Sequence, residues 1–167
     1  MNILQSNSLL PLETKNCLDI NIDHEWFITK SYNINMQNLS ELQRFVMEFK
    51  RQDLNNLVEC YWGNKQVKYG ICYKYSTVLC ALLLKNFAKK DIYVLICHDT
   101  GHNFYNSIHA SVIYLLNDQW IEIDLTKEKA ELAVSTIPLE AMADRVICLF
   151  NNNTSFININ KNLSYQV

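Results

Sequence analysis

Three side chains in the sequence have the types needed to build and activate a sulfur nucleophile: Cys72, His109 and Asp124. A thiolate attacks carbonyl carbon, an imidazole exchanges a proton with the sulfur, and a carboxylate orients the imidazole. Cys72 follows Gly70 and opens an apolar helical pattern, so we expect it at the start of a helix. The unpaired N–H groups and the positive end of the helix dipole there favour a thiolate. Gly70 would let the chain turn sharply and let a substrate approach closely.

His109 and Asp124 fall in two strand-like runs, residues 108–116 and 120–125, which together indicate a hairpin. We expect a two-residue turn at Asn117-Asp118 between them. With that turn, His109 and Asp124 lie on one face of the hairpin, one diagonal step apart. Diagonal neighbours have Cα atoms ~7–8 Å apart, so the carboxylate could reach the imidazole. A slip of one residue would place the two side chains on opposite faces.

Further elements must hold this hairpin against the cysteine. A capping box formed by Ser40 and Gln43 predicts a helix that begins at Ser40 and runs to about Asn56. The apolar spacing from Cys72 predicts a buried helix that ends near Ala88. The segment Ser135-Thr136-Ile137-Pro138 predicts the opening of a last helix, with the proline near its first turn. Short strands are expected at residues 18–22, 92–97 and 156–159.

The order of these elements, two helices followed mainly by strands, favours an α+β fold with an antiparallel sheet packed on a buried helix. Low glycine and proline contents, 3 and 2 residues, disfavour an all-β fold with many tight turns. No internal repeat and no Gly/Ser/Pro-rich linker divides the chain. We therefore expect residues 1–167 to form a single catalytic domain, with a core at about 40–150. Residues 151–167 are an Asn-rich tail that could add a last strand.

Composition and charge exclude several classes of function. Hydrophobic residues make up 49% and charged residues 19% of the chain, which is typical of a folded globular protein. The net charge of -2 gives no basic excess, so neither nucleic acid nor a membrane surface is an expected partner. No apolar run reaches the ~18 residues of a membrane-spanning helix. Without a secretory signal, we expect a cytoplasmic location or export that needs no cleavable signal peptide.

The six cysteines are expected to be reduced thiols, most of them packed as small apolar side chains. No Cys-x-x-Cys pair is present. A second cluster could bind zinc through a thiol and imidazoles, and its members are Cys97, His98, His102 and His109. Its spacing matches no standard zinc site, so we expect no metal and no cofactor. A zinc-binding regulator remains an alternative class of protein.

Three segments, in this order along the chain, resemble motifs of the transglutaminase-like superfamily of cysteine enzymes, which shares the papain-like fold. They are Val67-Lys68-Tyr69-Gly70-Ile71-Cys72-Tyr73, His109-Ala110-Ser111-Val112 and Trp120-Ile121-Glu122-Ile123-Asp124-Leu125-Thr126. The resemblance implies a papain-like fold and a catalytic triad of Cys72, His109 and Asp124. It implies acyl transfer on a protein or peptide substrate: the thiolate attacks an amide, ammonia or an amine leaves, and water or an acceptor amine resolves the thioester.

Within this superfamily, a glutamine deamidase or transglutaminase-like activity is the expected function. The alternatives are a cysteine peptidase that cleaves backbone peptide bonds and a catalytically silent binding module of the same fold. The chain departs from the classical cross-linking enzymes at Ile71, Tyr73 and Ser111, where those enzymes have or commonly have Gln, Trp and Trp. It also lacks an Asp-x-Asp-x-Asp-Gly calcium loop. A calcium-dependent cross-linker is therefore not expected.

Other side chains near Cys72 could bind the substrate. Gln66 precedes Cys72 at a spacing similar to that of the papain-type oxyanion glutamine, and the indole N–H groups of Trp62 and Trp26 are alternative donors. Tyr69 and Tyr73 flank the cysteine and could line a substrate channel. Ordinary packing is the alternative for these tyrosines, and we favour it for one of the two.

Overall fold

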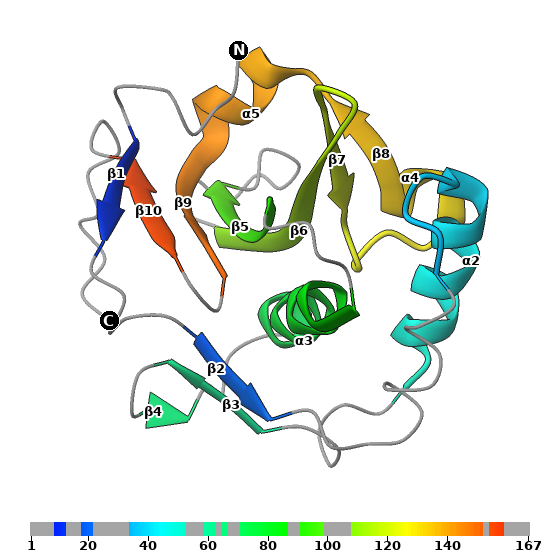
Figure 1. Ribbon diagram of the computed structural model, residues 1–167, viewed down its shortest axis with the longest axis horizontal. Coiled ribbons are helices and arrows are strands. Elements are labelled where there is room, and N and C mark those ends of the chain that lie inside the picture. The colour runs from blue at the N-terminus through cyan, green and yellow to red at the C-terminus, as the bar shows by residue number, and fades with distance from the viewer. Residues whose placement is uncertain are drawn as a thin grey trace.

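The structure, a computed structural model, describes residues 9–12, 18–21, 34–52, 59–62, 65–66, 71–86, 91–98, 108–151 and 154–158. These residues form the mixed α+β fold expected from the sequence (Figure 1). The helices are α2 (Leu39–Lys50), α3 (Ile71–Asn86), α4 (Ala130–Ala133) and α5 (Leu139–Arg145). The first strands are β1 (Leu9–Leu12), β2 (Leu18–Asn21), β3 (Glu59–Trp62), β4 (Lys65–Gln66) and β5 (Ile92–His98). The later strands are β6 (Ile108–Leu116), β7 (Gln119–Ile123), β8 (Val134–Ile137), β9 (Val146–Phe150) and β10 (Ser155–Asn158).

The strands form two sheets. The larger has seven strands in the order β1-β10-β9-β5-β6-β7-β8, and every neighbouring pair in it is antiparallel. The smaller sheet has the order β2-β3-β4, also antiparallel. Strands β5 and β6 therefore occupy the middle of the larger sheet, where both faces can be covered.

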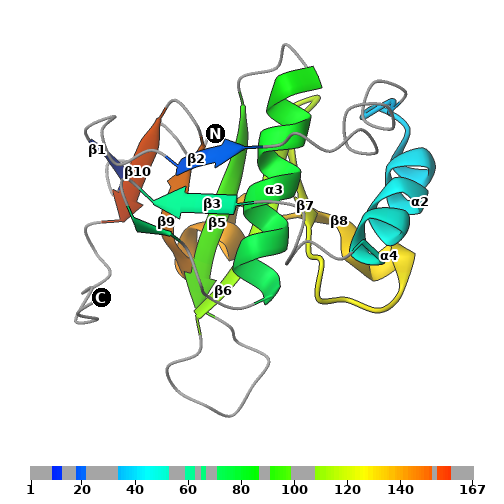
Figure 2. The ribbon, with the colours of Figure 1, turned by 90° about the horizontal axis from the view of Figure 1, so that it is seen from below.

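Helices cover the two faces of the central strands. Helix α3 lies against one face of β5 and β6, and α5 lies on the other side of the sheet (Figures 1 and 2). Strand alternation explains the two cores that result. Val112 and Tyr114 pack with the buried side chains of α2 and α3, whereas Ile113 packs with Met142 of α5. The apolar run of β6 is thus buried on both faces, which is why it shows little polar alternation.

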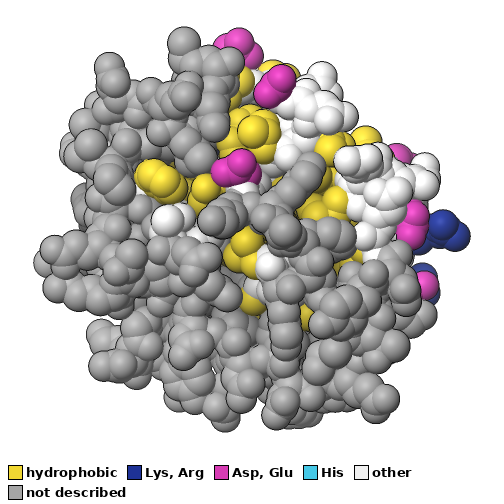
Figure 3. Space-filling model, in the orientation of Figure 1, with side chains coloured by type: hydrophobic (Ala, Val, Ile, Leu, Met, Phe, Trp, Pro, Cys, Tyr) yellow, Lys and Arg dark blue, Asp and Glu magenta, His cyan; other side chains and the backbone are white. Residues whose placement is uncertain are grey.

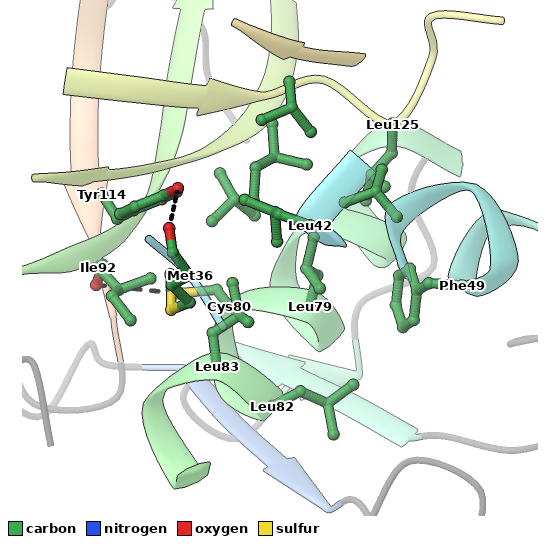
Figure 4. Close-up of a cluster of buried hydrophobic side chains, with 14 of the residues drawn as sticks. Met36, Leu42, Phe49, Leu79, Cys80, Leu82, Leu83, Ile92, Tyr114 and Leu125 are labelled. Carbon is green, nitrogen blue, oxygen red and sulfur yellow. Dashed lines mark hydrogen bonds between the residues drawn. The ribbon is translucent and has the colours of Figure 1, made fainter. Parts of the chain in front are cut away.

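The larger core is formed where α2 and α3 meet the sheet (Figure 4). Leu42 and Phe49 of α2 and Leu79 and Leu83 of α3 are completely buried. The hydroxyl group of Tyr114 lies inside this core and donates a hydrogen bond to a backbone carbonyl oxygen 3.1 Å away in the segment before α2. That bond satisfies a polar group that would otherwise be buried without a partner.

The hairpin of β6 and β7 has the predicted turn. Asn117 and Asp118 have φ angles of 49° and 63°, the left-handed values of a type I′ turn. Leu116 pairs with Gln119, and the ladder continues to the pair of Val112 with Ile123. The register deduced from a two-residue turn is therefore confirmed.

The helix expected to begin at Ser40 begins earlier and is shorter. Helix α2 starts at Leu39, and its N-cap is Asn38, whose side chain accepts a hydrogen bond from the backbone N–H of Glu41 at 3.2 Å. The capping box of Ser40 and Gln43 was therefore wrong, because an asparagine further upstream caps the helix first. The helix ends at Lys50 and not near Asn56.

The last helix also begins later than predicted. Residues Val134–Ile137 form strand β8, which pairs with β7, and Pro138 is the N-cap of α5 rather than a residue of its first turn. A proline disfavours helical backbone in the residue before it, which explains why Ile137 stays extended. Helix α5 is short, and the chain continues directly into strand β9, which was not predicted.

Other expected elements agree with the structure. Strands were predicted at positions that overlap β2, β5 and β10, and the buried helix is α3, which ends at Asn86. Strands β1, β3 and β4 were not predicted. None of the helices in the described part of the chain is long and apolar enough to cross a membrane. In Figure 3 the described surface shows acidic side chains interspersed with apolar and polar ones.

Candidate active site

Cys72 is the second residue of α3 and is half-buried. Its thiol is in the first turn of the helix, where the backbone N–H groups have no carbonyl partner within the helix. A hydrogen bond with His109 is the largest influence on the pKa of the Cys72 thiol and lowers it. Burial opposes that effect, but hydrogen bonds with the backbone of Ala110 and of Tyr73 lower the pKa further. The net result favours the thiolate.

His109 is the second residue of β6 and reaches both other members of the predicted triad. Its Nε2 atom lies 3.0 Å from Oδ1 of Asp124, an ion pair in which the N–H is poorly aligned for a hydrogen bond. Since Nε2 faces the carboxylate, Nδ1 is the nitrogen left for the thiol. The contacts with Asp124 and then with Cys72 raise the pKa of His109 to about 10, although burial acts in the opposite direction.

Asp124 follows the last residue of β7, and its backbone N–H donates to the carbonyl oxygen of Ala133 at 2.8 Å. Its Oδ1 atom accepts hydrogen bonds from the hydroxyl and the backbone N–H of Thr126, at 2.7 and 3.0 Å. Lys127 lies further away, with Nζ 3.8 Å from Oδ2. Burial acts to raise the pKa of Asp124, but the contacts with His109 and Thr126 outweigh it and lower the pKa to about 2. The carboxylate is therefore charged at neutral pH.

A buried serine joins the helix that carries the thiol to the strand that carries the imidazole. Ser76 lies one helical turn after Cys72, is completely buried, and donates its hydroxyl to the carbonyl oxygen of Ala110 at 3.2 Å. Ala110 is the residue after His109 and also contacts the thiol through its backbone. The same peptide segment is thus held by α3 at two places. Ser76 was not predicted as a site residue, although its spacing from Cys72 places both on one side of the helix.

The other cysteines with described side chains differ from Cys72. Cys80 and Cys97 are buried, and Cys148 is half-buried. Burial raises the pKa of Cys80, and it raises the pKa of Cys148 to about 12. Cys80 and Cys148 therefore stay protonated at neutral pH, and all three cysteines pack as small apolar groups. Burial is the main cause of the raised pKa of Cys148, whereas the hydrogen bond with His109 is the largest influence on the pKa of Cys72.

The predicted substrate-binding residues have mixed outcomes. Tyr73 is half-buried, and its ring packs against Phe150 with the ring centroids 6.1 Å apart. This contact agrees with ordinary packing for Tyr73. Trp62 ends β3 and Gln66 ends β4, and the structure describes their backbone only. Tyr69 and Trp26 lie outside the described residues. The choice of an oxyanion donor therefore stays a prediction.

The zinc alternative gains nothing from the structure. Cys97 is 1% exposed and packs in the core on the α5 side of the sheet, and His98 is the last residue of β5. His102 lies outside the described residues. Among the residues that are described, no group of three or more His, Cys, Asp and Glu side chains is arranged to hold a metal ion.

Comparisons of the chain with protein-family models, with curated proteins and with solved structures find no match.

Proposed function

We propose that this protein is a cysteine-dependent acyl-transfer enzyme that acts on protein amides and has the papain-like, transglutaminase-like fold. The observation that carries the proposal is the contact of one imidazole with a thiol and a carboxylate. The pKa of Cys72 is lowered, that of His109 is raised to about 10, and that of Asp124 is lowered to about 2. These directions favour a thiolate beside an imidazolium, the reactive form of a catalytic cysteine.

Several features support catalysis over a silent binding role. The thiol of Cys72 is half-buried and not sealed from solvent, whereas Cys80 and Cys97 are buried. The carboxylate of Asp124 is held by two donors of Thr126, which fixes the side to which the imidazole turns. A chain that kept only the fold would have no need of an imidazole held between thiol and carboxylate, because buried ion pairs contribute little net stability.

In the proposed reaction the Cys72 thiolate attacks the carbonyl carbon of an amide and forms a tetrahedral intermediate. The carbon–nitrogen bond breaks, the His109 imidazolium gives its proton to the leaving nitrogen, and a thioester remains on Cys72. Water then attacks the thioester while His109 takes a proton from it. The acid is released, and His109 and Cys72 return to the imidazolium and thiolate forms. Asp124 stabilises the imidazolium throughout and does not take its proton.

The side-chain amide of glutamine is the substrate group we favour. The segment around Cys72 resembles the nucleophile motif of transglutaminase-like enzymes more than that of papain-type peptidases. With water as the acceptor the product is glutamate, and with an amine it is a substituted glutamine. Cleavage of a backbone peptide bond would use the same thioester and is separated from deamidation by the test below.

The first test measures the alkylation rate of each cysteine by iodoacetamide at pH 7, followed by mass spectrometry of the peptides. We expect Cys72 to react fastest, and His109→Ala to slow that reaction. Cys148 is the control, because it too is partly exposed but has a raised pKa. A Cys72 thiol that reacts no faster than Cys148 would overturn the proposal.

The second test separates the reactions on a glutamine-containing protein. Deamidation releases ammonia and adds about one dalton, transamidation adds the mass of the supplied amine, and proteolysis shortens the chain. We expect ammonia release with the wild type and none with Cys72→Ser. Chain cleavage that depends on Cys72, without ammonia release, would replace the deamidase with a peptidase.

A further inference from the structure

A buried polar layer lies directly behind the His109–Asp124 pair. Strand alternation places Ser111 on the same face of β6 as His109 and Glu122 on the same face of β7 as Asp124, each one step further into the sheet. Ser111 is completely buried and Glu122 is 8% exposed. Arg145, the last residue of α5, reaches this layer from the helix that covers the face.

The carboxylate of Glu122 is occupied at both oxygens. The Ser111 hydroxyl donates to Oε1 at 2.6 Å, and Nη2 of Arg145 donates to Oε2 at 2.6 Å. Ser111 is the next residue after His109 on this face, so the Glu122 network adjoins the His109–Asp124 pair, and different donors hold the two carboxylates. Asp124 is held by Thr126, whereas Glu122 is held by Ser111 and Arg145.

Stability alone does not account for this layer. Taking two charges out of water costs several kcal/mol in general, and a well-packed apolar pair often stabilises a core as well or better. The surrounding face is apolar, with Leu95, Ile113 and Val146 all buried there. The Glu122–Arg145 pair adjoins Ser111, the neighbour of His109 on this face, and this position points to a functional role for the pair.

An unpaired Glu122 would be drawn to the nearest cation, because charges attract strongly where water is excluded. His109 lies on the same face of the hairpin, next to the Ser111 that binds Glu122, and its contacts favour the imidazolium. The carboxylate of Glu122, on its longer side chain, would attract the His109 ring and turn it away from Asp124 and from the thiol. Arg145 and Ser111 remove that competition by binding both oxygens of Glu122.

We propose that Arg145 and Ser111 are positioning residues that hold Glu122 off His109, so that the imidazole pairs with Asp124 and stays turned toward Cys72. The inference rests on the proposed function, because the orientation of the ring matters only if His109 serves the thiol. Arg145 also attracts Asp124, and this attraction is among the influences that raise the pKa of Arg145. It therefore interacts with both carboxylates.

The groups around the Glu122–Arg145 pair come from every strand beside it. They are Cys97 on β5, Ser111 on β6, Asp124 after β7, and Ser135, which pairs with Glu122 from β8. Arg145 is the cation that pairs with Glu122 in the described part of the chain. Lys127 lies beside Asp124 and is half exposed to solvent, so its charge is screened more strongly.

The test uses three variants of the full chain and the alkylation rate of Cys72. Arg145→Met keeps the length of the side chain and removes its charge, and we expect the rate to fall roughly tenfold or more, as for a buried charge left unpaired. Arg145→Lys keeps the charge and should retain most of the rate. Arg145→Met combined with Glu122→Gln should recover the rate to within about threefold of wild type, because the amide carries no competing charge.

The recovery separates positioning from a structural role, since a fold damaged by losing Arg145 would not be repaired by losing its partner too. The inference is overturned if Arg145→Met reacts at the wild-type rate, or if the double variant stays as slow as the single one. If Arg145→Met alone does not fold, the double variant decides: it should react within about threefold of the wild-type rate, and a tenfold loss would overturn the inference. The proposed function fails separately, if Cys72 of the wild type is alkylated no faster than Cys148.

Discussion

Ser76 donates its hydroxyl to the carbonyl oxygen of Ala110 across 3.2 Å, and this bond links the helix of the nucleophile to the strand of the base. Cys72 lies one turn before Ser76, and His109 lies one residue before Ala110. The separation of thiol and imidazole is therefore set by a bond that neither of them makes. Because both partners are buried, water cannot replace the bond if one of them is removed.

Ser76→Ala should slow the alkylation of Cys72 and move its apparent pKa upward, toward the ordinary thiol value of 9.0. The variant should also lose about 1 kcal/mol of stability, the usual effect of removing a buried hydrogen bond. Thr77→Ala is the matched control, because that hydroxyl is also buried but bonds within the same helix, to the carbonyl oxygen of Lys74. An unchanged pH profile for Ser76→Ala, measured from pH 5 to 9, would contradict this role.

Thr126→Val should weaken the hold on Asp124. The variant removes the hydroxyl donor at 2.7 Å and keeps the backbone donor, so the pKa of Asp124 should rise and the alkylation of Cys72 should slow. A hydrogen bond to a charged group contributes about 1.5 kcal/mol, which corresponds to roughly tenfold in rate if all of it is felt by the imidazole. Thr126→Ser keeps the hydroxyl and should behave as wild type. Equal rates for the valine and serine variants would rule out a part for the hydroxyl.

The stability of the Cys72→Ala variant should fall as the pH rises above 6.5. Without the thiol, Asp124 still raises the pKa of His109 in the folded state above its unfolded value of 6.5. Below pH 6.5 both states bind the proton, and the stabilisation is fully present. Above it the folded state binds more protons than the unfolded state, so the free energy of unfolding decreases until His109 titrates in the folded protein.

Urea unfolding from pH 5 to 9 measures this effect, with Cys72→Ala/His109→Gln as the reference for all other titrating groups. The difference between the two variants should shrink above pH 6.5, and a constant difference would show that the folded state leaves His109 unperturbed. The wild type should decline less over this range. In its folded state the lowered pKa of Cys72 favours loss of a proton that the unfolded thiol keeps, and this offsets the proton that His109 retains.

Asp118→Val should destabilise the hairpin of β6 and β7. Asp118 has a φ of 63°, and a β-branched side chain in that region loses about 1–2 kcal/mol relative to residues that tolerate it. Asp118→Gly should be as stable as wild type or more so, because glycine adopts positive φ freely. The free energy of unfolding measures both variants. A valine variant as stable as the glycine one would mean that the turn relaxes to another type.

Local rules account for the parts of the site that lie on one element or one hairpin. The alternation of side chains and the turn at Asn117-Asp118 were enough to place His109 and Asp124 on one face, and the structure has them 3.0 Å apart. The start of a helix near Cys72 followed from its apolar spacing. In contrast, Asn38 and Ser40 both have side chains that suit an N-cap, and only the folded backbone shows that Asn38 caps the helix.

Contacts between distant elements could not be read in this way. Arg145 meets Glu122 because α5 folds back over the sheet, and the sequence there predicted a helix with a different start. Ser76 meets Ala110 because α3 crosses β6, and no spacing rule relates a helix residue to a strand residue that far along the chain. The site residues that were not predicted from the sequence are those whose partners come from another element.

The two-residue turn between β6 and β7 has a consequence for how the site is assembled. His109 and Asp124 are brought together by a hairpin whose loop is as short as a hairpin allows, so closing it loses little chain entropy. Cys72 joins them only when α3 docks on the sheet across a longer stretch of chain. The base and its carboxylate therefore form a local unit that can pair early in folding, and the nucleophile arrives last.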